Sequence, residues 1–324
     1  MPTFESATLG SEATLPEAMR GTVTLSVDVE DWHQLVGRRL SGHLRGCSSH
    51  VEAQMDRVLA LLDEHRVRGT FFVLGLVARE KPDLVRRIAS HGHEVASHGI
   101  GHVPLHQLDV RDMRADVVDS RKLLSDVIGQ DVVGFRAPEF SIVEQNSHVL
   151  GAIAEAGYRY DSSIVPVLHR RYGIRWFARG PVCVNVGGRT LWELPLATLR
   201  TPVGNVPVGG GGYFRLLPGA VLEPVMRSIA RRGEHAMLYF HPYEFTEKRL
   251  TPPHDTMPRS RRARTRATVW FTLQAVGRTR LPARVERVLR FSRSVRAVDL
   301  VDALESNVGN AADASGRPHD VHTS

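Results

Sequence analysis

The alternation of apolar and polar positions divides most of the chain into short strands and amphipathic helices. Thr22–Asp28 and Gly69–Leu74 are β-branched or aromatic and apolar, so each segment predicts a buried strand. Between them, apolar residues recur at helical spacing from Val51 to Leu62. The same criteria predict further helices over 76–90, 111–128, 145–156 and 219–231, and further strands over 94–96, 132–135, 158–161, 191–194 and 236–240.

Strands that alternate with helices of this length are typical of parallel βαβ units. Polar side chains follow the predicted strands directly, as Asp28, Arg136, Asp161 and His241 do. A (β/α) barrel places its active site at the carboxyl ends of its strands. The sequence therefore predicts an α/β fold with a functional site at that end of the sheet.

The two ends of the chain differ from this pattern. Residues 1–20 predict a flexible N-terminal tail, and residues 304–324 are small, polar and weakly patterned, which predicts a disordered tail. Between them we predict a catalytic domain over 21–248 and an Arg-rich C-terminal extension over 249–303, packed on or beside that domain.

Positive charge is concentrated in one segment of this 324-residue chain, whose formal net charge is +7. Residues 249–296 contain 13 arginines against only Asp255 and Glu286. Such a segment can be a solvated surface or can contact a membrane face or an anionic polymer. Because the charge belongs to this segment and not to the whole chain, we expect no nucleic-acid partner.

Cysteine usage and hydropathy point to a cytoplasmic location, with membrane association left open. Cys47 and Cys183 lie far apart, so neither a disulfide framework nor a thiolate metal site is expected. The first twenty residues carry three glutamates and no apolar run of the kind found in secretory signals. No stretch reaches the ~18 apolar residues of a spanning helix.

Three carboxylates follow the first predicted strand within four residues: Asp28, Glu30 and Asp31. They repel one another and are costly to bury together unless a cation neutralises them. Strand alternation places Asp28 and Glu30 on one face. One could then bind a metal while the other acts as a general base, although an acidic loop that caps a helix is the alternative.

His98 and His102 are four residues apart, so one helical turn would point both imidazoles in the same direction. Gly99 and Gly101 leave open whether the pair lies on a helix or on a tight loop. Two histidines and one carboxylate, with positions left for water, are typical of a catalytic metal site. A pair of ordinary surface histidines is the alternative.

Three further residues could take part in catalysis, each with a structural alternative. Arg136, followed by Pro138, can aim its guanidinium at a carboxylate or form a structural ion pair. Asp161 could equally cap a turn. His241 follows an apolar strand, where it could act as a general acid or be an ordinary edge histidine.

Taken in order, these motifs resemble those of the NodB-homology polysaccharide deacetylases, carbohydrate esterase family four. The resemblance implies a distorted (β/α) barrel of about seven strands. It assigns Asp28 as the catalytic base and Glu30 as a metal ligand, with Asp31 as the alternative ligand. His98 and His102 complete the implied ligand set, with Gly99 in place of the family's hydroxyl residue.

The resemblance also implies roles around the metal. Arg136 would steady the base, the backbone N–H of Glu139 would stabilise the oxyanion, and Asp161 would tune His241 as the general acid. Leu238 is one residue out of the family's register before His241, so Tyr239 could form the pocket wall instead. The aromatic residues expected in the substrate groove, beside Glu139, are Trp192, Tyr213 and Phe214.

The implied activity is hydrolysis of N-acetyl groups on hexosamine residues of a bacterial polysaccharide, in exopolysaccharide or cell-envelope glycan synthesis. Asp28–Trp32, Gly209–Arg215 and His241–Glu244 look like an exopolysaccharide-locus subgroup. Zinc is the expected metal, with cobalt, manganese or nickel as alternatives, and an N-acetylated glycan is the expected partner. The alternatives are a catalytically silent glycan-binding scaffold and an amidohydrolase of a small cyclic amide.

Overall fold

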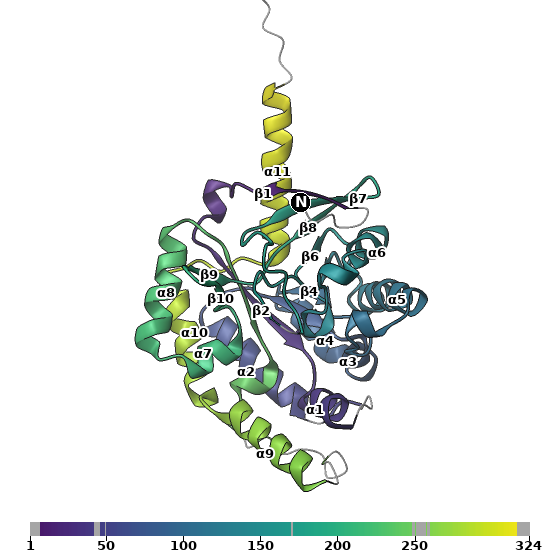
Figure 1. Ribbon diagram of the computed structural model, residues 1–324, viewed down its shortest axis with the longest axis vertical. Coiled ribbons are helices and arrows are strands. Elements are labelled where there is room, and N and C mark those ends of the chain that lie inside the picture. The colour runs from purple at the N-terminus through teal and green to yellow at the C-terminus, as the bar shows by residue number, and fades with distance from the viewer. Residues whose placement is uncertain are drawn as a thin grey trace, which may run out of the picture.

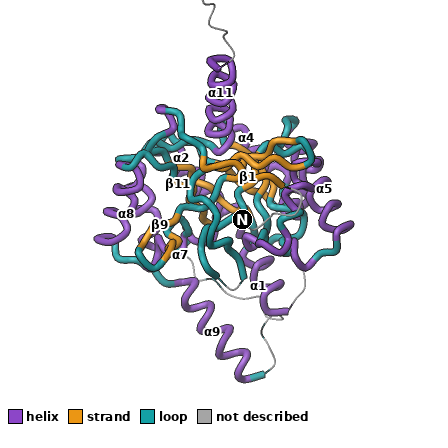
Figure 2. Tube along the Cα trace, turned by 45° about the horizontal axis from the view of Figure 1, so that its top comes forward, coloured by secondary structure: helices purple, strands orange, loops and turns teal. Residues whose placement is uncertain are grey.

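Seven parallel strands form the centre of the molecule, with helices around them (Figures 1 and 2). The structure is a computed structural model that describes residues 7–41, 46–48, 50–169, 171–247, 250, 257 and 260–315. Neighbouring strands pair in parallel in the order β8–β6–β5–β4–β3–β2–β11. In chain order these strands are β2 (Val23–Val29), β3 (Thr70–Val73), β4 (Glu94–Ser97), β5 (Gly134–Phe135), β6 (Tyr160–Asp161), β8 (Arg189–Glu193) and β11 (Ala236–Phe240).

The barrel closes between β8 and β11 without a continuous ladder of hydrogen bonds between the two strands. Among the described residues, two isolated parallel bridges join the segment after β8 to β11: Leu196 to Met237 and Gly210 to Tyr239. The prediction of a distorted α/β barrel of about seven strands is therefore confirmed. The remaining strands lie outside this barrel: β7 (Val182–Val186) extends the β8 edge, and β9 (Thr198–Thr201) pairs with β10 (Gly204–Pro207) as a separate hairpin.

Most of the predicted helices are present at the expected positions. The segment 76–90 differs, because it forms two helices and not one. Pro82 lacks a backbone N–H and begins the second helix, after Lys81 leaves helical geometry at φ −135° and ψ 54°. The helices are α1 (Trp32–Ser41), α2 (His50–Glu64), α3 (Gly75–Glu80), α4 (Pro82–Ser90), α5 (Val110–Ile128), α6 (Val149–Glu155), α7 (Gly211–Leu216), α8 (Gly219–Arg231), α9 (Arg261–Ala275), α10 (Leu281–Leu289) and α11 (Ala297–Ser315).

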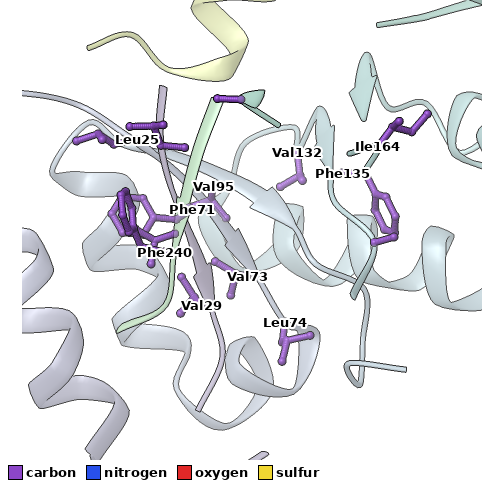
Figure 3. Close-up of a cluster of buried hydrophobic side chains, with 14 of the residues drawn as sticks. Leu25, Val29, Phe71, Val73, Leu74, Val95, Val132, Phe135, Ile164 and Phe240 are labelled. Carbon is purple, nitrogen blue, oxygen red and sulfur yellow. The ribbon is translucent and has the colours of Figure 1, made fainter. Parts of the chain in front are cut away.

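Strand alternation sorts the core into two layers and aims the functional residues inward. Leu25, Val29 and Phe71 belong to the large cluster of apolar side chains that includes residues of the surrounding helices (Figure 3). Phe72 belongs instead to a second buried cluster, together with Met237. Because side chains alternate along a strand, Asp28 shares a face with Ser26, opposite to the face of Leu25 and Val29.

The end of the barrel that contains the strand N-termini is covered by α11. Leu300 and Leu304 belong to the second buried cluster, and the Val298 N–H donates to Glu94 Oε2 at 3.0 Å. The prediction of disorder from residue 304 is wrong as far as Ser315, since this helix continues to that residue. It emerges from the barrel as the long helix in Figure 1. Residues 316–324 lie outside the described residues.

The N-terminal segment is also more ordered than its sequence suggests. β1 (Ala7–Glu12) pairs antiparallel with β7, so the predicted tail over 1–20 is corrected for this part, and residues 1–6 lie outside the described residues. The predicted boundary at 248/249 falls on residues that are not described. Among the described helices, none combines the length and apolar character needed to cross a bilayer.

Two glycines with the same backbone angle allow the contact between Gly277, just after α9, and α7 to be tested. Gly277 and Gly188 both have φ +75°, but a Cβ on Gly277 would lie 2.2 Å from the Arg215 carbonyl oxygen, whereas Gly188 has nothing within 4 Å. Gly188→Ala should cost about 1–2 kcal/mol for the left-handed backbone. Gly277→Ala should cost roughly 1–3 kcal/mol more, because the overlap adds to the same strain. Denaturant unfolding measures both, and equal losses would contradict the described contact.

Candidate active site

A fully buried arginine organises the carboxyl ends of the central strands. Arg136 Nη1 donates to Asp28 Oδ1 and to Ser26 Oγ, each at 2.7 Å. Its Nε and Nη2 donate to the backbone oxygen and the hydroxyl of Ser162, each at 3.0 Å, and its guanidinium lies 3.9 Å above the Phe72 ring. These contacts hold one oxygen of Asp28 and leave the other, Oδ2, directed to the histidines.

Glu30, His98 and His102 form a buried cluster whose ligand atoms all lie within 4.8 Å of one another. His102 Nε2 is 2.7 Å from Glu30 Oε2. Neither Glu30 oxygen has a hydrogen bond of normal geometry among the described residues, although both are buried. Burying a carboxylate is costly unless its charge is neutralised, and a cation between these three side chains would neutralise it.

The orientation of His98 also suits metal binding. Its Nδ1 donates to the Arg136 carbonyl oxygen at 2.8 Å, which leaves the lone pair on Nε2, 4.0 Å from Asp28 Oδ2. Burial lowers the pKa of His98 to about 4, so its imidazole is neutral, as a metal ligand must be. His98 and His102 lie in the turn after β4, and not on a helix.

His241 is held by a chain of charged groups that sequence reasoning missed. Its Nδ1 is 3.4 Å from Glu244 Oε2 and its Nε2 is 3.1 Å from Glu30 Oε1. Burial would lower the pKa of His241, but these two carboxylates outweigh burial and raise it to about 10. Arg215 Nε in turn donates to Glu244 Oε1 at 2.7 Å.

Arg215 connects this site to α9. Its Nη1 donates to the carbonyl oxygens of Leu273, Gln274 and Val276, at the C-terminal end of that helix. Gln274 and Trp270 of α9 line the same pocket as Asp28 and His241. The C-terminal extension therefore forms part of the wall of the candidate site.

The glycine run 209–212 gave a signal for these contacts. A Cβ on Gly211 would lie 2.0 Å from Glu244 Oε2, and one on Gly210 would lie 2.6 Å from the Tyr239 ring. Larger residues cannot stand there without displacing Glu244 or Tyr239. Gly210 and Gly211 are needed because the backbone passes directly against two residues of the pocket.

The pocket continues past Glu139 into a second hollow. Glu139 and Phe140 both have positive φ, 54° and 52°, a strained turn that non-glycine residues rarely adopt. Glu139, Arg171 and Tyr172 line both the pocket and the neighbouring hollow. Trp176, whose side chain is 41% exposed, lines the far hollow.

Several expected positions differ in the structure. Asp31 is committed elsewhere, because it accepts hydrogen bonds from the His33 N–H at 2.6 Å and the Ser48 hydroxyl at 2.7 Å. Of the cluster of three carboxylates, only Asp28 and Glu30 line the pocket.

Asp161 is the second difference, since the expected contact with His241 is made by Glu244. Asp161 accepts a hydrogen bond from the Ser163 hydroxyl at 2.6 Å and lies against Glu193. Burial raises the pKa of both Asp161 and Glu193. The pair lies near Arg136, which helps to stabilise the negative charge that remains.

The expected groove aromatics are only partly where they were predicted. Glu139 lines the pocket, but Trp192 and Phe214 are buried in the two core clusters, so both predictions are corrected. Tyr213 does not line the pocket, but it forms a hydrogen bond with Tyr172, which does. Tyr239 lines the pocket while Leu238 is fully buried in the core.

A second histidine cluster has different chemistry. Asp63, His91 and His93 also have ligand atoms within 4.8 Å of one another. However, His93 Nδ1 accepts the Gly69 N–H at 3.2 Å, so its Nε2 carries a proton and is not free to bind a metal. This cluster is therefore a poorer cation site than the one around Glu30.

Fold and site together define a protein of the NodB type: a distorted α/β barrel with acids and histidines at the carboxyl ends of its strands. Residues 48–160 match the family model "Polysaccharide deacetylase", and residues 162–293 match "Domain of unknown function (DUF3473)". Residues 48–160 therefore form a polysaccharide deacetylase domain of the NodB type.

Curated relatives match over part of their length. A chitooligosaccharide deacetylase of Sinorhizobium fredii is 42% identical over 67 residues, which cover 21% of this chain and 31% of the relative. One from Bradyrhizobium is 32% identical over 100 residues, 31% and 45% of the two chains. A peptidoglycan-N-acetylglucosamine deacetylase of Bacillus cereus is 31% identical over 88 residues, 27% and 32% of the two chains. The chain thus spans less than half the length of each of these relatives.

Solved structures share the fold across nearly the whole chain. One described as a polysaccharide deacetylase of Mycobacterium smegmatis aligns with a TM-score of 0.61 and 21% identity, over 93% of this chain and 96% of the other. The PuuE allantoinase aligns with a TM-score of 0.58 and 16% identity, over 92% and 95%. At such identities the likeness establishes the fold alone.

The Glu30–His98–His102 cluster predicts which variants of the protein lose bound zinc. After loading with zinc and gel filtration, the wild-type chain should retain about one equivalent. Glu30→Gln and His102→Gln should each lose most of it, because each removes a ligand of a three-ligand site. Metal content measured by mass spectrometry checks this. His91→Gln is the control for the second cluster, and loss of zinc in that variant would contradict the assignment.

Proposed function

We propose that this protein is a metal-dependent hydrolase that removes N-acetyl groups from hexosamine residues of a polysaccharide. The observation that carries the proposal is the juxtaposition in one pocket of a buried Glu30–His98–His102 cluster, an arginine-held Asp28 and His241. The curated relatives are named as deacetylases of chitooligosaccharides and of peptidoglycan N-acetylglucosamine, which supports the same chemistry.

Glu30, His98 and His102 would hold the metal, and zinc is the best candidate because imidazole and carboxylate ligands suit it. When bound, such an ion acts as a Lewis acid that acidifies water and polarises a carbonyl oxygen. The short distance between Glu30 Oε2 and His102 Nε2 and the lone pair of His98 Nε2 support this ligand set.

The other residues of the pocket divide the proton transfers. Asp28, held by Arg136 through one oxygen, takes a proton from the attacking water with the other. His241, whose charge Glu244 stabilises, donates a proton to the departing nitrogen. In this mechanism the backbone N–H of Glu139, which lies in the strained turn that lines the pocket, stabilises the developing oxyanion. Asp161 lies near Arg136, and Glu244 is the carboxylate that contacts His241 Nδ1.

A polymeric substrate is favoured over a small cyclic amide. The pocket does not end at the catalytic residues but continues along Glu139, Arg171 and Tyr172 to the exposed Trp176. A cyclic amide would use only the first part of this groove. The acid and histidine groups also argue for catalysis over a silent scaffold. The exopolysaccharide role rests on the sequence resemblance, and we propose it together with a cytoplasmic location and contact of the Arg-rich segment with an anionic surface.

Asp28→Asn tests the assignment of the base. The variant should lose about 10²–10⁴-fold in kcat for acetate release from N-acetylglucosamine oligomers, because an amide cannot accept the proton. Its zinc content should remain that of the wild type, since Asp28 is not one of the proposed ligands. Asp109→Asn, at the exposed N-cap of α5, is the matched control and should retain activity. Full activity of Asp28→Asn would refute the proposed role.

Trp176→Ala tests the length of the groove. We expect kcat/KM to fall roughly 10-fold on a pentameric N-acetylglucosamine oligomer, because one aromatic platform for a sugar ring is lost. A dimer, too short to reach Trp176, should be hydrolysed as before. The control is Val203→Ala, which trims an exposed apolar residue that does not line the groove. Equal losses on the dimer and the pentamer would contradict an extended groove.

A further inference from the structure

Helix α9 presents two different faces. On the inner face, Trp270 stacks on Trp32 with ring centroids 5.4 Å apart and planes 6° apart, and Phe271 lies 5.6 Å from the same ring. Ala267 is buried on this face, and Gln274 lines the pocket. The inner face is therefore fixed against the candidate active site.

The outer face carries an exposed apolar row. Val269, Leu273 and Val276 are 54%, 52% and 45% exposed, and their spacing of four and three residues places them on one side of the helix. Leu216, 54% exposed, follows Arg215, whose backbone abuts Gly277 just beyond this row. Exposed aliphatic residues at helical spacing point to a binding surface more than scattered ones do.

Positive charge continues the same row toward the N-terminus of α9. Arg262 and Arg266 precede Val269 by seven and three residues, so they lie on the same side, and both are exposed. Arg261 and Arg264 add to the charge of this first part of the helix. No acidic residue occurs between Asp255 and Glu286, so the segment does not neutralise its own charge.

We infer that the outer face of α9 binds peripherally to an anionic lipid bilayer. The arginines would contact acidic headgroups, while Val269, Leu273 and Val276 enter the boundary between headgroups and acyl chains. A soluble polyanion would contact the arginines but would leave the apolar row exposed to water. The apolar row therefore favours a lipid bilayer over a soluble polyanion. Figure 1 shows α9 on the outside of the molecule, at the end opposite to the projecting helix α11, so a flat surface can reach it.

Docking through this face would bring the pocket close to the bilayer. The pocket wall and the binding face are opposite sides of one helix, and a helix is ~10 Å across. The Arg215 contacts at the end of α9 hold the pocket and this face in a fixed relation. This consequence rests on the proposed function: a membrane-held glycan is the substrate class that gains from it.

Vesicle sedimentation with the full chain tests the inference. The protein should sediment with vesicles of equimolar phosphatidylcholine and phosphatidylglycerol, and not with phosphatidylcholine alone, and binding should weaken as salt is added. Arg262→Gln with Arg266→Gln should reduce binding roughly 30-fold. Val269→Gln with Leu273→Gln, which keep the charge and favour a helix, should reduce it roughly 10-fold.

The controls separate this inference from the proposed function. Arg111→Gln with Arg189→Gln removes the same charge from exposed positions elsewhere and should leave vesicle binding unchanged. Acetate release from a soluble N-acetylglucosamine trimer should be the same in all of these variants, so loss of activity would concern the catalytic assignment alone. Failure to sediment, equal binding to neutral vesicles, or full binding after the apolar substitutions would overturn the inference.

Discussion

The guanidinium of Arg136 is removed from water at the centre of the barrel, and the geometry of the site depends on how its charge is balanced. One edge pairs with Asp28, another bonds to Ser162, and its flat face rests on Phe72. The carbonyl oxygen of the same residue orients His98. Breaking such a buried pair from one side typically costs about 3–5 kcal/mol. Base orientation, ligand orientation and local stability therefore rest on one residue.

The parts of this arrangement that are local in sequence could be predicted. Strand alternation placed Asp28 and Glu30 on one face, and the motif order indicated Arg136, the histidine pair and His241. The roles of Glu244 and Arg215 were not predicted. Hydrophobic periodicity does not show that Glu244 turns back to His241, three residues earlier, or that Arg215 contacts Glu244 from a distant segment. Trp192 and Phe214 were misplaced for a related reason: an aromatic residue near a motif can face the core as easily as the groove, and strand register decides between them.

Both ends of the chain are more ordered than their sequences predict. Ala7–Glu12 has too weak a pattern to predict a strand, but it pairs with the exposed edge of β7. The polar sequence after residue 304 does not indicate a helix, but α11 begins against the end of the barrel, where Thr70 Oγ1 accepts the Ala297 N–H and Glu94 accepts the Val298 N–H. In both cases a tertiary partner supplies what local propensity lacks. Prediction from local sequence alone therefore underestimates how much of the termini forms regular secondary structure.

Because Arg215 bonds to the end of α9, the predicted catalytic domain over 21–248 is structurally incomplete without the C-terminal extension. A chain shortened near residue 248 would keep all the acids and histidines proposed for catalysis. It would nevertheless leave Nη1 of the buried Arg215 without its three carbonyl acceptors and would open the pocket on the side of Trp270 and Gln274. The barrel would also lose α11 and expose Glu94. The barrel and the C-terminal extension thus form one structural unit, because neither completes the wall of the pocket without the other.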